Sequence, residues 1–281
     1  MKSRKVFPCC LTIAGSDSGG NAGVQADLRA FHTYSLHGCT VFTALTAQNP
    51  FGVSAIHSVP PAFIAEQLDA VLGTYDIKAL KTGMIGSPEA VETVAERLVG
   101  VPGIAKVIDP VMIATSGARL ISDEAISVVK RKLLPLATLI TPNLPEAEEL
   151  LGNHNTVNSR QADAAHSREL AKALYDRFGA AVLVKGGHGA NSAAVDVLFD
   201  GDDFSEFTAP WIANPASTHG TGCSLAAALA SELALGQDLR SAVAGAKEYV
   251  HRAIAGSYCV GPRGCAVLGF IRSARRSKRR L

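Results

Sequence analysis

The chain has 281 residues, of which 47% are hydrophobic and 19% charged, a composition that excludes intrinsic disorder and is typical of a compact soluble protein. Its length lies near the upper limit for one hydrophobic core, so residues 1–271 are predicted to form one domain. The formal net charge of +2 depends on the last ten residues, which hold six arginines and lysines and no acid; without them the net charge is −4. Residues 272–281 are therefore predicted to form a basic, disordered tail, with an arm that binds nucleic acid as the less favoured interpretation.

The six cysteines and the N-terminal segment bear on the compartment. No two cysteines form a C-x-x-C pair, and a chain of this size does not need disulfides to fold, so we expect a reducing cytoplasm. Three basic residues followed by the apolar run 6–14 are similar to a signal peptide. Pro8 and Thr12 interrupt that run, however, and a glycine-rich loop follows it, so we interpret it as the first core strand. The sequence contains no run of about twenty apolar residues, so no membrane span is predicted.

Short β-rich runs alternate with helix-like segments along most of the chain. The predicted strands are residues 9–14, 40–45, 77–82, 106–109, 138–140 and 181–184, with a pair of more antiparallel character at 194–199 and 204–210. The predicted helices are residues 22–34, 61–72, 88–99, 123–133, 160–178, 224–235 and 239–255. This alternation predicts an α/β fold, a three-layer α/β/α sandwich around a mostly parallel central sheet.

Ligands of open α/β sheets gather outside the carboxyl ends of the strands. Nearly every predicted strand is followed there by polar or glycine-rich sequence, and these segments are residues 15–23, 48–49, 81–84, 109–112, 141–146 and 185–188. The sequence therefore predicts a ligand site along this edge of the sheet.

The segment His219-Gly220-Thr221-Gly222-Cys223 runs directly into a predicted helix. Glycines on both sides of Thr221 leave backbone N–H groups uncovered, and a helix N-terminus directs its unpaired donors toward an anion. A helix N-terminus also lowers the pKa of a thiol, so Cys223 is expected to favour the thiolate and to accept a proton. The alternative is an ordinary helix start with an inert, buried cysteine.

The glycine-rich loop 15–23 lacks the lysine and the spacing of a Walker A sequence and does not match G-x-G-x-x-G. Its glycines would still permit close approach to a flat ligand, although a plain strand-to-helix turn explains them equally well. Asp27 comes four residues after Gly23, close enough to the edge of the site to accept a hydrogen bond from a ligand amine. Alternatively, Asp27 is an exposed carboxylate on the helix surface.

Asn143 and Glu146 have the spacing of a helix capping box, and capping alone would explain them. In a functional interpretation, Glu146 and Asp109 lie near a Mg²⁺ ion that keeps most of its water. Lys185 follows a buried-looking strand and needs a partner, which a nucleotide phosphate or a structural carboxylate would supply. His188 is either a phosphate neighbour or a surface histidine, and Met84 either fills a core gap or packs on an aromatic ring.

Taken together, the motifs resemble those of the ribokinase-like superfamily and, within it, the hydroxymethylpyrimidine and phosphomethylpyrimidine kinases of thiamine biosynthesis. The matching stretches, in family order over roughly residues 10–250, are TIAGSDSGGNAGVQADL, TALTAQN, KTGMIG, IDPVM, LITPNLPEAEELLG, VLVKGGH and STHGTGCSLAAALA. The resemblance implies a ribokinase-like fold and an ATP- and Mg²⁺-dependent kinase that phosphorylates 4-amino-5-hydroxymethyl-2-methylpyrimidine and then its monophosphate.

The resemblance also implies a role for each residue that matches a family motif. The residues implied to bind the aminopyrimidine are Gly15, Asp27, Gln48, Met84 and Val111. Those implied to hold the nucleotide phosphates are Lys185, His188, Gly220, Thr221 and Gly222. Asp109, Asn143 and Glu146 are implied to lie around Mg²⁺, and Cys223 to occupy the position of the catalytic base.

Two other functions stay open at this point. A pyridoxal kinase on the same scaffold is the nearer one, because some pyridoxal kinases share the cysteine after THGTG. The second is a non-catalytic regulator that keeps the ligand site and binds nucleic acid through its tail. For the kinase we expect a homodimer with small-molecule substrates and neither nucleic-acid nor membrane partners.

Overall fold

A computed structural model of the chain describes residues 6–112, 120–153, 164–186, 193–262 and 264–269. Nine strands form one sheet in the order β3-β2-β1-β4-β5-β6-β7-β8-β9, and β10 and β11 form a separate hairpin. The strands of the large sheet are β1 (Cys9–Asp17), β2 (His37–Asn49), β3 (Gly52–Ser58), β4 (Ile77–Thr82), β5 (Ala105–Ile108), β6 (Leu139–Ile140), β7 (Ala181–Val184), β8 (Ala193–Phe199) and β9 (Phe204–Pro210). The hairpin strands are β10 (Tyr258–Val260) and β11 (Cys265–Val267).

The centre of the sheet is parallel and its edges are antiparallel. Strands β2, β1, β4, β5, β6 and β7 pair in parallel, whereas β3 at one edge and β8 and β9 at the other are antiparallel to their neighbours. Parallel strands are normally buried on both faces, which explains the continuous apolar run of β7. The predicted mostly parallel sheet is confirmed, and so is the antiparallel pair at residues 194–199 and 204–210.

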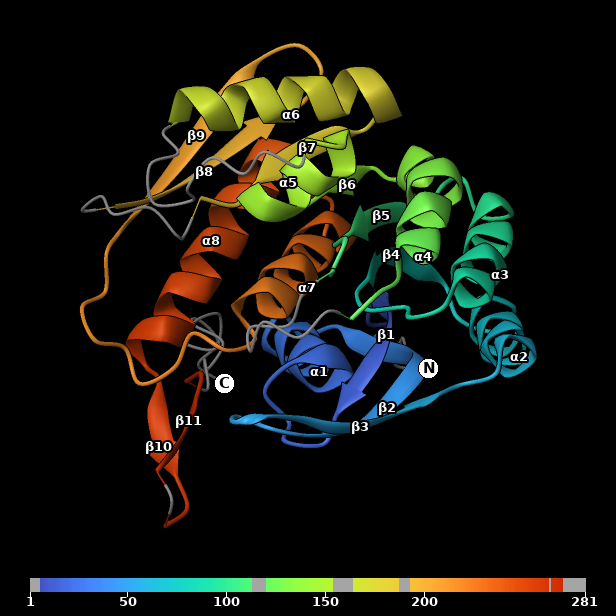
Figure 1. Cartoon of the computed structure of the whole chain (residues 1–281), viewed down its shortest axis with the longest axis horizontal. Helices are drawn as coiled ribbons and strands as arrows, with labels where there is room; N and C mark the ends of the chain where they lie inside the picture. Colours follow the sequence, from blue (N-terminus) through green and yellow to red (C-terminus); the bar gives the residue numbers. More distant parts are fainter. Residues whose placement is uncertain (1–5, 113–119, 154–163, 187–192, 263, 270–281) are drawn as a thin grey trace, which may run out of the picture.

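Helices cover both faces of the sheet, as the three-layer prediction requires (Figure 1). One face carries α1 (Gly23–Thr33), α7 (Thr221–Ala234) and α8 (Leu239–Ala255), whose buried side chains share one core cluster. The other face carries α2 (Pro61–Leu72), α3 (Pro88–Val99), α4 (Asp123–Val128), α5 (Leu144–Leu151) and α6 (Ala164–Phe178), which pack into a second cluster. The fold is the predicted three-layer α/β/α sandwich.

Local sequence signals set several helix starts. Ser87 caps α3 by accepting a hydrogen bond from the backbone N–H of Ala90, and Pro88 occupies the first helical position. Asp238 caps α8 by accepting one from Ser241. Helix α7 begins differently, because its N-cap is Gly220 and no side chain caps it.

Several elements differ from the prediction. Helix α7 begins at Thr221 rather than at residue 224, and the predicted helix 123–133 is divided into α4 and a π-helical turn, Val129–Leu133. Strand β3 and helix α5 were not predicted as elements. All residues of β3 are exposed or half-buried, so the strand lacks the buried alternation by which strands are found in a sequence.

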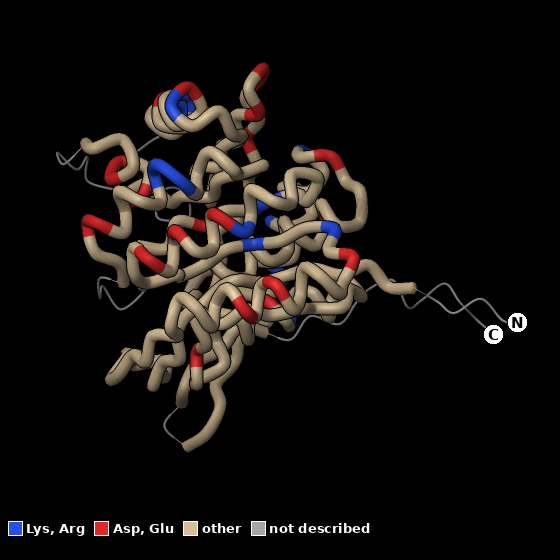
Figure 2. The backbone as a smooth tube through the Cα atoms, turned by 90° about the vertical axis from the view of Figure 1, so that its right-hand side faces the viewer, with Lys and Arg blue, Asp and Glu red and all other residues tan. Residues whose placement is uncertain are grey.

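The helices and charges of the described part bear on the expected partners. None of its helices is both long and apolar enough to cross a membrane. On the face drawn in Figure 2, acidic and basic positions are interspersed among the helices, unlike the one-sign basic stripe that is typical of nucleic-acid binding. The predicted basic tail, 272–281, lies outside the described residues.

Candidate active site

The predicted site residues lie where the carboxyl ends of the parallel strands meet the start of α7. Met84 follows β4, Asp109 follows β5 and Lys185 follows β7. The segment after β6 joins them, because Asn143 and Lys185 form a parallel bridge and the Lys185 N–H donates to the Pro142 carbonyl oxygen at 2.8 Å. The prediction of a site along this edge of the sheet is therefore consistent with the fold.

The turn that opens α7 has the geometry of an anion cradle. Gly220 adopts a left-handed φ of 89°, and a Cβ atom there would lie 2.0 Å from the carbonyl oxygen of Asn21, so only glycine fits. The first backbone bond of the helix runs from the Ser224 N–H to the Gly220 carbonyl oxygen. The Thr221 N–H donates to the Thr218 carbonyl oxygen at 3.4 Å. With no side-chain cap at Gly220, the next two amides, of Gly222 and Cys223, are available to an anion.

Lys185 lies beside this turn and pairs with two carboxylates. Its Nζ is 2.8 Å from Asp109 Oδ1 and 3.9 Å from Glu146 Oε2. A Cβ atom at Gly222 would lie 3.7 Å from Lys185 Nζ and 3.8 Å from Asp109 Oδ2, so the cation and the helix start face the same space. Burial opposes the charge of Lys185, but Asp109 and Glu146 outweigh it and raise the pKa of its ammonium group.

Asn143 and Glu146 form the predicted capping box of α5. Asn143 Oδ1 accepts the Glu146 N–H at 2.9 Å, and Glu146 Oε2 accepts the Asn143 N–H at 2.9 Å. Glu146 is also almost fully buried, and burial raises the pKa of its carboxyl group while Lys185 opposes that rise. The capping interpretation of this pair is confirmed.

The same carboxylates can be tested as a metal site. No group of three or more His, Cys, Asp or Glu side chains within the described ranges could hold a metal ion directly. Asp109 and Glu146 instead share one lysine, which makes a closed all-protein cage impossible. Two carboxylates beside an anion cradle do fit Mg²⁺, which keeps several waters and takes few protein oxygens.

Cys223 lies in the first turn of α7, half-buried, near a group of buried charges. Burial raises the pKa of its thiol; Lys81 lowers it in part, and Asp27 and Asp109 raise it further. The expectation that the helix N-terminus makes Cys223 a thiolate is therefore wrong for this structure. The loss of solvation on burial is the largest effect on the thiol and outweighs the nearby Lys81.

Neither predicted position of Asp27 is found. A pyrimidine contact would need an accessible carboxylate, and the alternative was an exposed carboxylate on the helix surface. The Asp27 side chain is fully buried, and its carboxylate is 3.1 Å from Lys81 Nζ and 2.6 Å from the Thr12 hydroxyl, which donates to it. Burial opposes the charge of Lys81, but this carboxylate outweighs it and raises the lysine pKa. Lys81 and Thr12 were not predicted, although a lysine within a buried strand is itself a signal, since it must have a partner.

The remaining residues assigned to the pyrimidine lie on neighbouring segments. The Gly15 N–H donates to the Met84 carbonyl oxygen at 3.1 Å, and a Cβ atom at Gly15 would lie 2.7 Å from Met84 Cε. Met84, Val111 and Gln48 are each half-buried, so each retains surface that a ligand could cover. The structure therefore brings Gly15 and Met84 into contact and leaves Gln48 on the adjoining strand β2.

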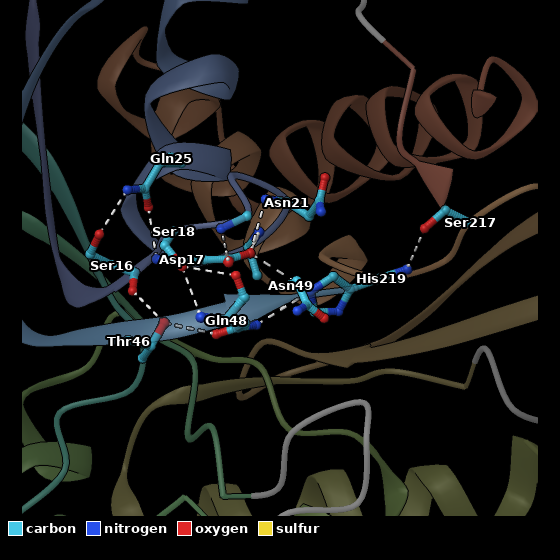
Figure 3. A network of polar contacts seen from close by, with 12 residues as sticks. Ser16, Asp17, Ser18, Asn21, Gln25, Thr46, Gln48, Asn49, Ser217 and His219 are labelled. Carbon is cyan, nitrogen blue, oxygen red and sulfur yellow. Dashed lines mark hydrogen bonds and ion pairs between the residues drawn. The ribbon is translucent and has the colours of Figure 1, made fainter. Parts of the chain in front are cut away.

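A polar network connects Gln48 to the first loop and to the turn before α7 (Figure 3). Thr46 Oγ1 lies 2.8 Å from the Ser16 carbonyl oxygen and 3.1 Å from Gln48 Oε1. His219 Nε2 lies 3.5 Å from Gln48 Nε2 and 3.8 Å from Asp17 Oδ2. Asp17 and His219 were not among the predicted site residues, and their contact joins segments 202 positions apart in the sequence (219 − 17).

Asp17 organises the glycine-rich loop that follows β1. Its carboxylate accepts backbone N–H groups from Gly19, Asn21 and Ala22 at 2.8 to 2.9 Å. Burial alone would raise its pKa, but the contact with His219 and these backbone donors outweigh burial and lower the pKa to about 2. His188, the last residue assigned to the phosphates, lies outside the described residues.

Comparisons with known proteins found relatives that match most of the chain. The phosphomethylpyrimidine kinase family matches residues 17–267. The chain is 44% identical over 256 residues to the hydroxymethylpyrimidine/phosphomethylpyrimidine kinase of Haemophilus influenzae, covering 89% of this chain and 92% of that protein. It is 49% identical over 254 residues to a thiamine biosynthesis bifunctional protein of Geobacter sulfurreducens, covering 89% of this chain and 50% of the relative. The chain therefore spans about half the length of that bifunctional relative.

Two solved structures share the fold. The phosphomethylpyrimidine kinase of Clostridium difficile superposes with a TM-score of 0.76 at 37% identity, covering 88% of this chain and 99% of that one. The pyridoxal kinase of Bacillus subtilis, solved as an ADP complex, superposes with a TM-score of 0.83 at 32% identity, covering 94% and 98%.

Proposed function

Because the chain belongs to the phosphomethylpyrimidine kinase family, we propose that it transfers a phosphoryl group from ATP to the hydroxymethyl group of 4-amino-5-hydroxymethyl-2-methylpyrimidine. In a second reaction it would transfer another phosphoryl group to the monophosphate, giving the diphosphate. Both reactions would belong to thiamine biosynthesis, which is supported by the similarity to the thiamine biosynthesis bifunctional protein of Geobacter sulfurreducens.

One observation carries this proposal. The uncapped start of α7, the Lys185 ammonium and the Asp109 carboxylate face the same space, with 3.7 and 3.8 Å between the Cβ position of Gly222 and the two side chains. Phosphoryl transfer is catalysed mainly by positioning and by electrostatic stabilisation of the transferring group. Backbone donors beside a lysine provide both.

In the first reaction the substrate hydroxyl oxygen forms a bond to the γ-phosphorus while the bond to the β–γ bridging oxygen breaks, and ADP leaves. The hydroxyl proton would go to the Cys223 sulfur, which must be in its thiolate form to accept it. The Gly222 amide and the Lys185 ammonium would stabilise the charge on the phosphoryl oxygens. Mg²⁺, held near Asp109 and Glu146 through water, would supply further charge neutralisation.

On the substrate side, Gln48 and Met84 would bind the pyrimidine. The amide of Gln48 offers a donor and an acceptor to the polar edge of an aminopyrimidine. The Met84 thioether would pack against the ring, next to the Cβ-free backbone of Gly15. Asp27 would act from beneath this pocket through its pair with Lys81, rather than by direct contact.

A second candidate function is the phosphorylation of pyridoxal. It is supported by the close superposition with the pyridoxal kinase of Bacillus subtilis. Both substrates are flat heteroaromatic alcohols, so the same phosphoryl chemistry would serve either one.

A phosphoryl-transfer assay with the pyrimidine alcohol, its monophosphate and pyridoxal side by side tests both functions. We expect kcat/KM to be highest for the pyrimidine alcohol, with measurable transfer to the monophosphate. Faster transfer to pyridoxal would favour the second function, and ADP release with none of the three acceptors would contradict both.

A further inference from the structure

A buried ion pair lies behind the phosphate side of the site, on elements that the proposed reaction does not use. Lys247 on α8 places its Nζ 2.7 Å from Oδ2 of Asp196 on β8, and the two side chains are only 11% and 9% exposed. The second carboxylate oxygen, Oδ1, accepts the backbone N–H of Gly186 at 3.0 Å. Gly186 directly follows Lys185.

Stability alone is a weak reason for such a pair. Taking two charges out of water costs free energy that their attraction returns only in part, and apolar side chains of similar volume often give equal or greater stability. What an apolar pair would not provide is an oriented acceptor for the Gly186 amide. The pair holds that acceptor in one place, because Lys247 binds one oxygen and leaves the other facing the amide.

The backbone at Lys185 and Gly186 is held from both sides. The Lys185 N–H donates to Pro142 on the β6 side, and the Gly186 N–H donates to Asp196 on the β8 side. Gly186 also approaches β8 closely, since a Cβ atom there would lie 1.9 Å from the Val195 carbonyl oxygen. These contacts set the point from which the Lys185 side chain reaches Asp109.

We propose that Asp196 and Lys247 are positioning residues for the nucleotide half of the active site. They hold the Gly186 amide, and through it they hold Lys185 where it meets the phosphates beside the start of α7. This inference rests on the proposed role of Lys185. It predicts that loss of the pair weakens the use of ATP and leaves the binding of the acceptor alcohol unchanged, because Gln48 and Met84 lie on β2 and after β4.

The test compares Lys247→Met, Lys247→Arg and Asp196→Asn with the unaltered full-length protein. Small displacements of a positioning group can cost about a hundredfold in rate, so we expect kcat/KM for ATP to fall about 10- to 100-fold in Lys247→Met. The KM for the acceptor should stay within about twofold. Lys247→Arg should recover most of the loss, since it restores a cation opposite Asp196. Asp196→Asn keeps an oxygen for the Gly186 amide and should show a smaller loss.

The matched control is Arg240→Met. Arg240 on α8 pairs at 2.9 Å with Asp200, so it links α8 to the residue that directly follows the carboxyl end of β8. The Arg240→Met variant should leave the KM for ATP and the KM for the acceptor unchanged. ADP affinity, measured by calorimetric titration of the folded variants, should fall in parallel with kcat/KM for ATP.

Equal increases in both KM values, an equal effect of Arg240→Met, or unchanged ADP affinity in Lys247→Met would each overturn the positioning role. The ADP titration does not depend on the acceptor. This titration therefore distinguishes failure of the positioning role from failure of the proposed function. Failure of the proposed function would appear as inactivity of the unaltered protein with the pyrimidine alcohol.

Discussion

As the proposed base, Cys223 would be needed in only one of the two proposed phosphoryl transfers. In the first, the nucleophile is an alcohol whose proton must leave. In the second, it is an oxygen of a phosphate monoester, which is already largely deprotonated near neutral pH because its second pKa is about 6. A base at Cys223 is therefore needed for the first transfer and not for the second.

We expect Cys223→Ala to lower kcat for the alcohol about 100- to 1,000-fold and kcat for the monophosphate by less than about tenfold. The measurement is a rate assay with each acceptor at saturating ATP. Cys259→Ala, at an exposed position on β10, is the matched control and should change neither rate. Equal losses for both acceptors would assign Cys223 to binding or to structure instead of proton transfer.

The same assignment makes the first transfer pH-dependent. Burial raises the pKa of Cys223 above its usual value of 9, so the thiolate is scarce at neutral pH and becomes more abundant as pH rises. We expect kcat for the alcohol to increase with pH without a plateau below about pH 9. Over the same range kcat for the monophosphate should stay nearly constant. A plateau near pH 7 for the alcohol would contradict an unassisted thiolate base.

Asp17 predicts a second pH effect, on stability. Its pKa is lowered to about 2 in the folded chain from 3.8 for the free group, so its contribution is present above pH 3.8 and is lost as pH falls toward 2. Asp17→Asn should reduce the free energy of unfolding near pH 7 by about 1 to 2 kcal/mol, a range that allows for solvent screening. Urea denaturation at several pH values measures this, and a difference that does not shrink between pH 4 and pH 2 would contradict it.

Some site residues could be predicted from the sequence and others could not. Motif order assigned Lys185, Asp109 and Glu146 to one site, and the structure brings both carboxylates within 4 Å of the Lys185 ammonium. Motif order equally assigned Asp27 to the ligand, whereas it is buried against Lys81. All three carboxylates near this edge are buried, and the partner of each depends on packing, for Asp27 on that of α1 against β1 and α7, which no local pattern contains.

At the scale of elements, α7 and α3 start in opposite ways. Ser87 caps α3 and satisfies one of its own amides, whereas Gly220 leaves the α7 amides available. A start of the first kind adds stability, and a start of the second kind leaves a binding site.

Gly220→Ala should therefore act on function more than on overall stability. The added methyl would meet the Asn21 carbonyl oxygen and would disfavour the left-handed conformation, displacing the turn. We expect kcat/KM for ATP to fall at least about tenfold. Ser87→Ala should instead cost about 1 kcal/mol in the free energy of unfolding with unchanged kinetics. Reversal of these two patterns, seen in kinetics and urea denaturation, would contradict the cradle.

Elements with strong local signals were predicted, and the others were not. Helices α2, α3 and α8 have the predicted bounds, because their apolar spacing and terminal residues agree. Helix α5 has only eight residues, and β3 has no buried residue, so neither produces a hydrophobic period long enough to detect. The hairpin of β10 and β11 has only three residues in each strand.

For the whole molecule, alternation of strands and helices was enough to predict the three-layer architecture, because a parallel sheet must be covered on both faces. The order of strands was not predictable in the same way. The return of β8 and β9 as an antiparallel edge, which places Asp196 against the Gly186 amide, depends on pairings between residues that no motif connects.

The basic tail, residues 272–281, is expected to contribute positive charge and no catalytic group. Every described residue to which we assign a role lies between Thr12 and Lys247, so removing residues 272–281 should leave kcat and both KM values within about twofold of the full chain. The formal net charge would change from +2 to −4, which should lower any retention on heparin or nucleic acid through lost counterion release. Kinetics and nucleic-acid affinity at two salt concentrations, measured on both chains, test the two effects separately. Loss of turnover on truncation would contradict the assignment of catalysis to the sheet edge and α7, and nucleic-acid affinity confined to the full chain at physiological salt would support the regulator instead.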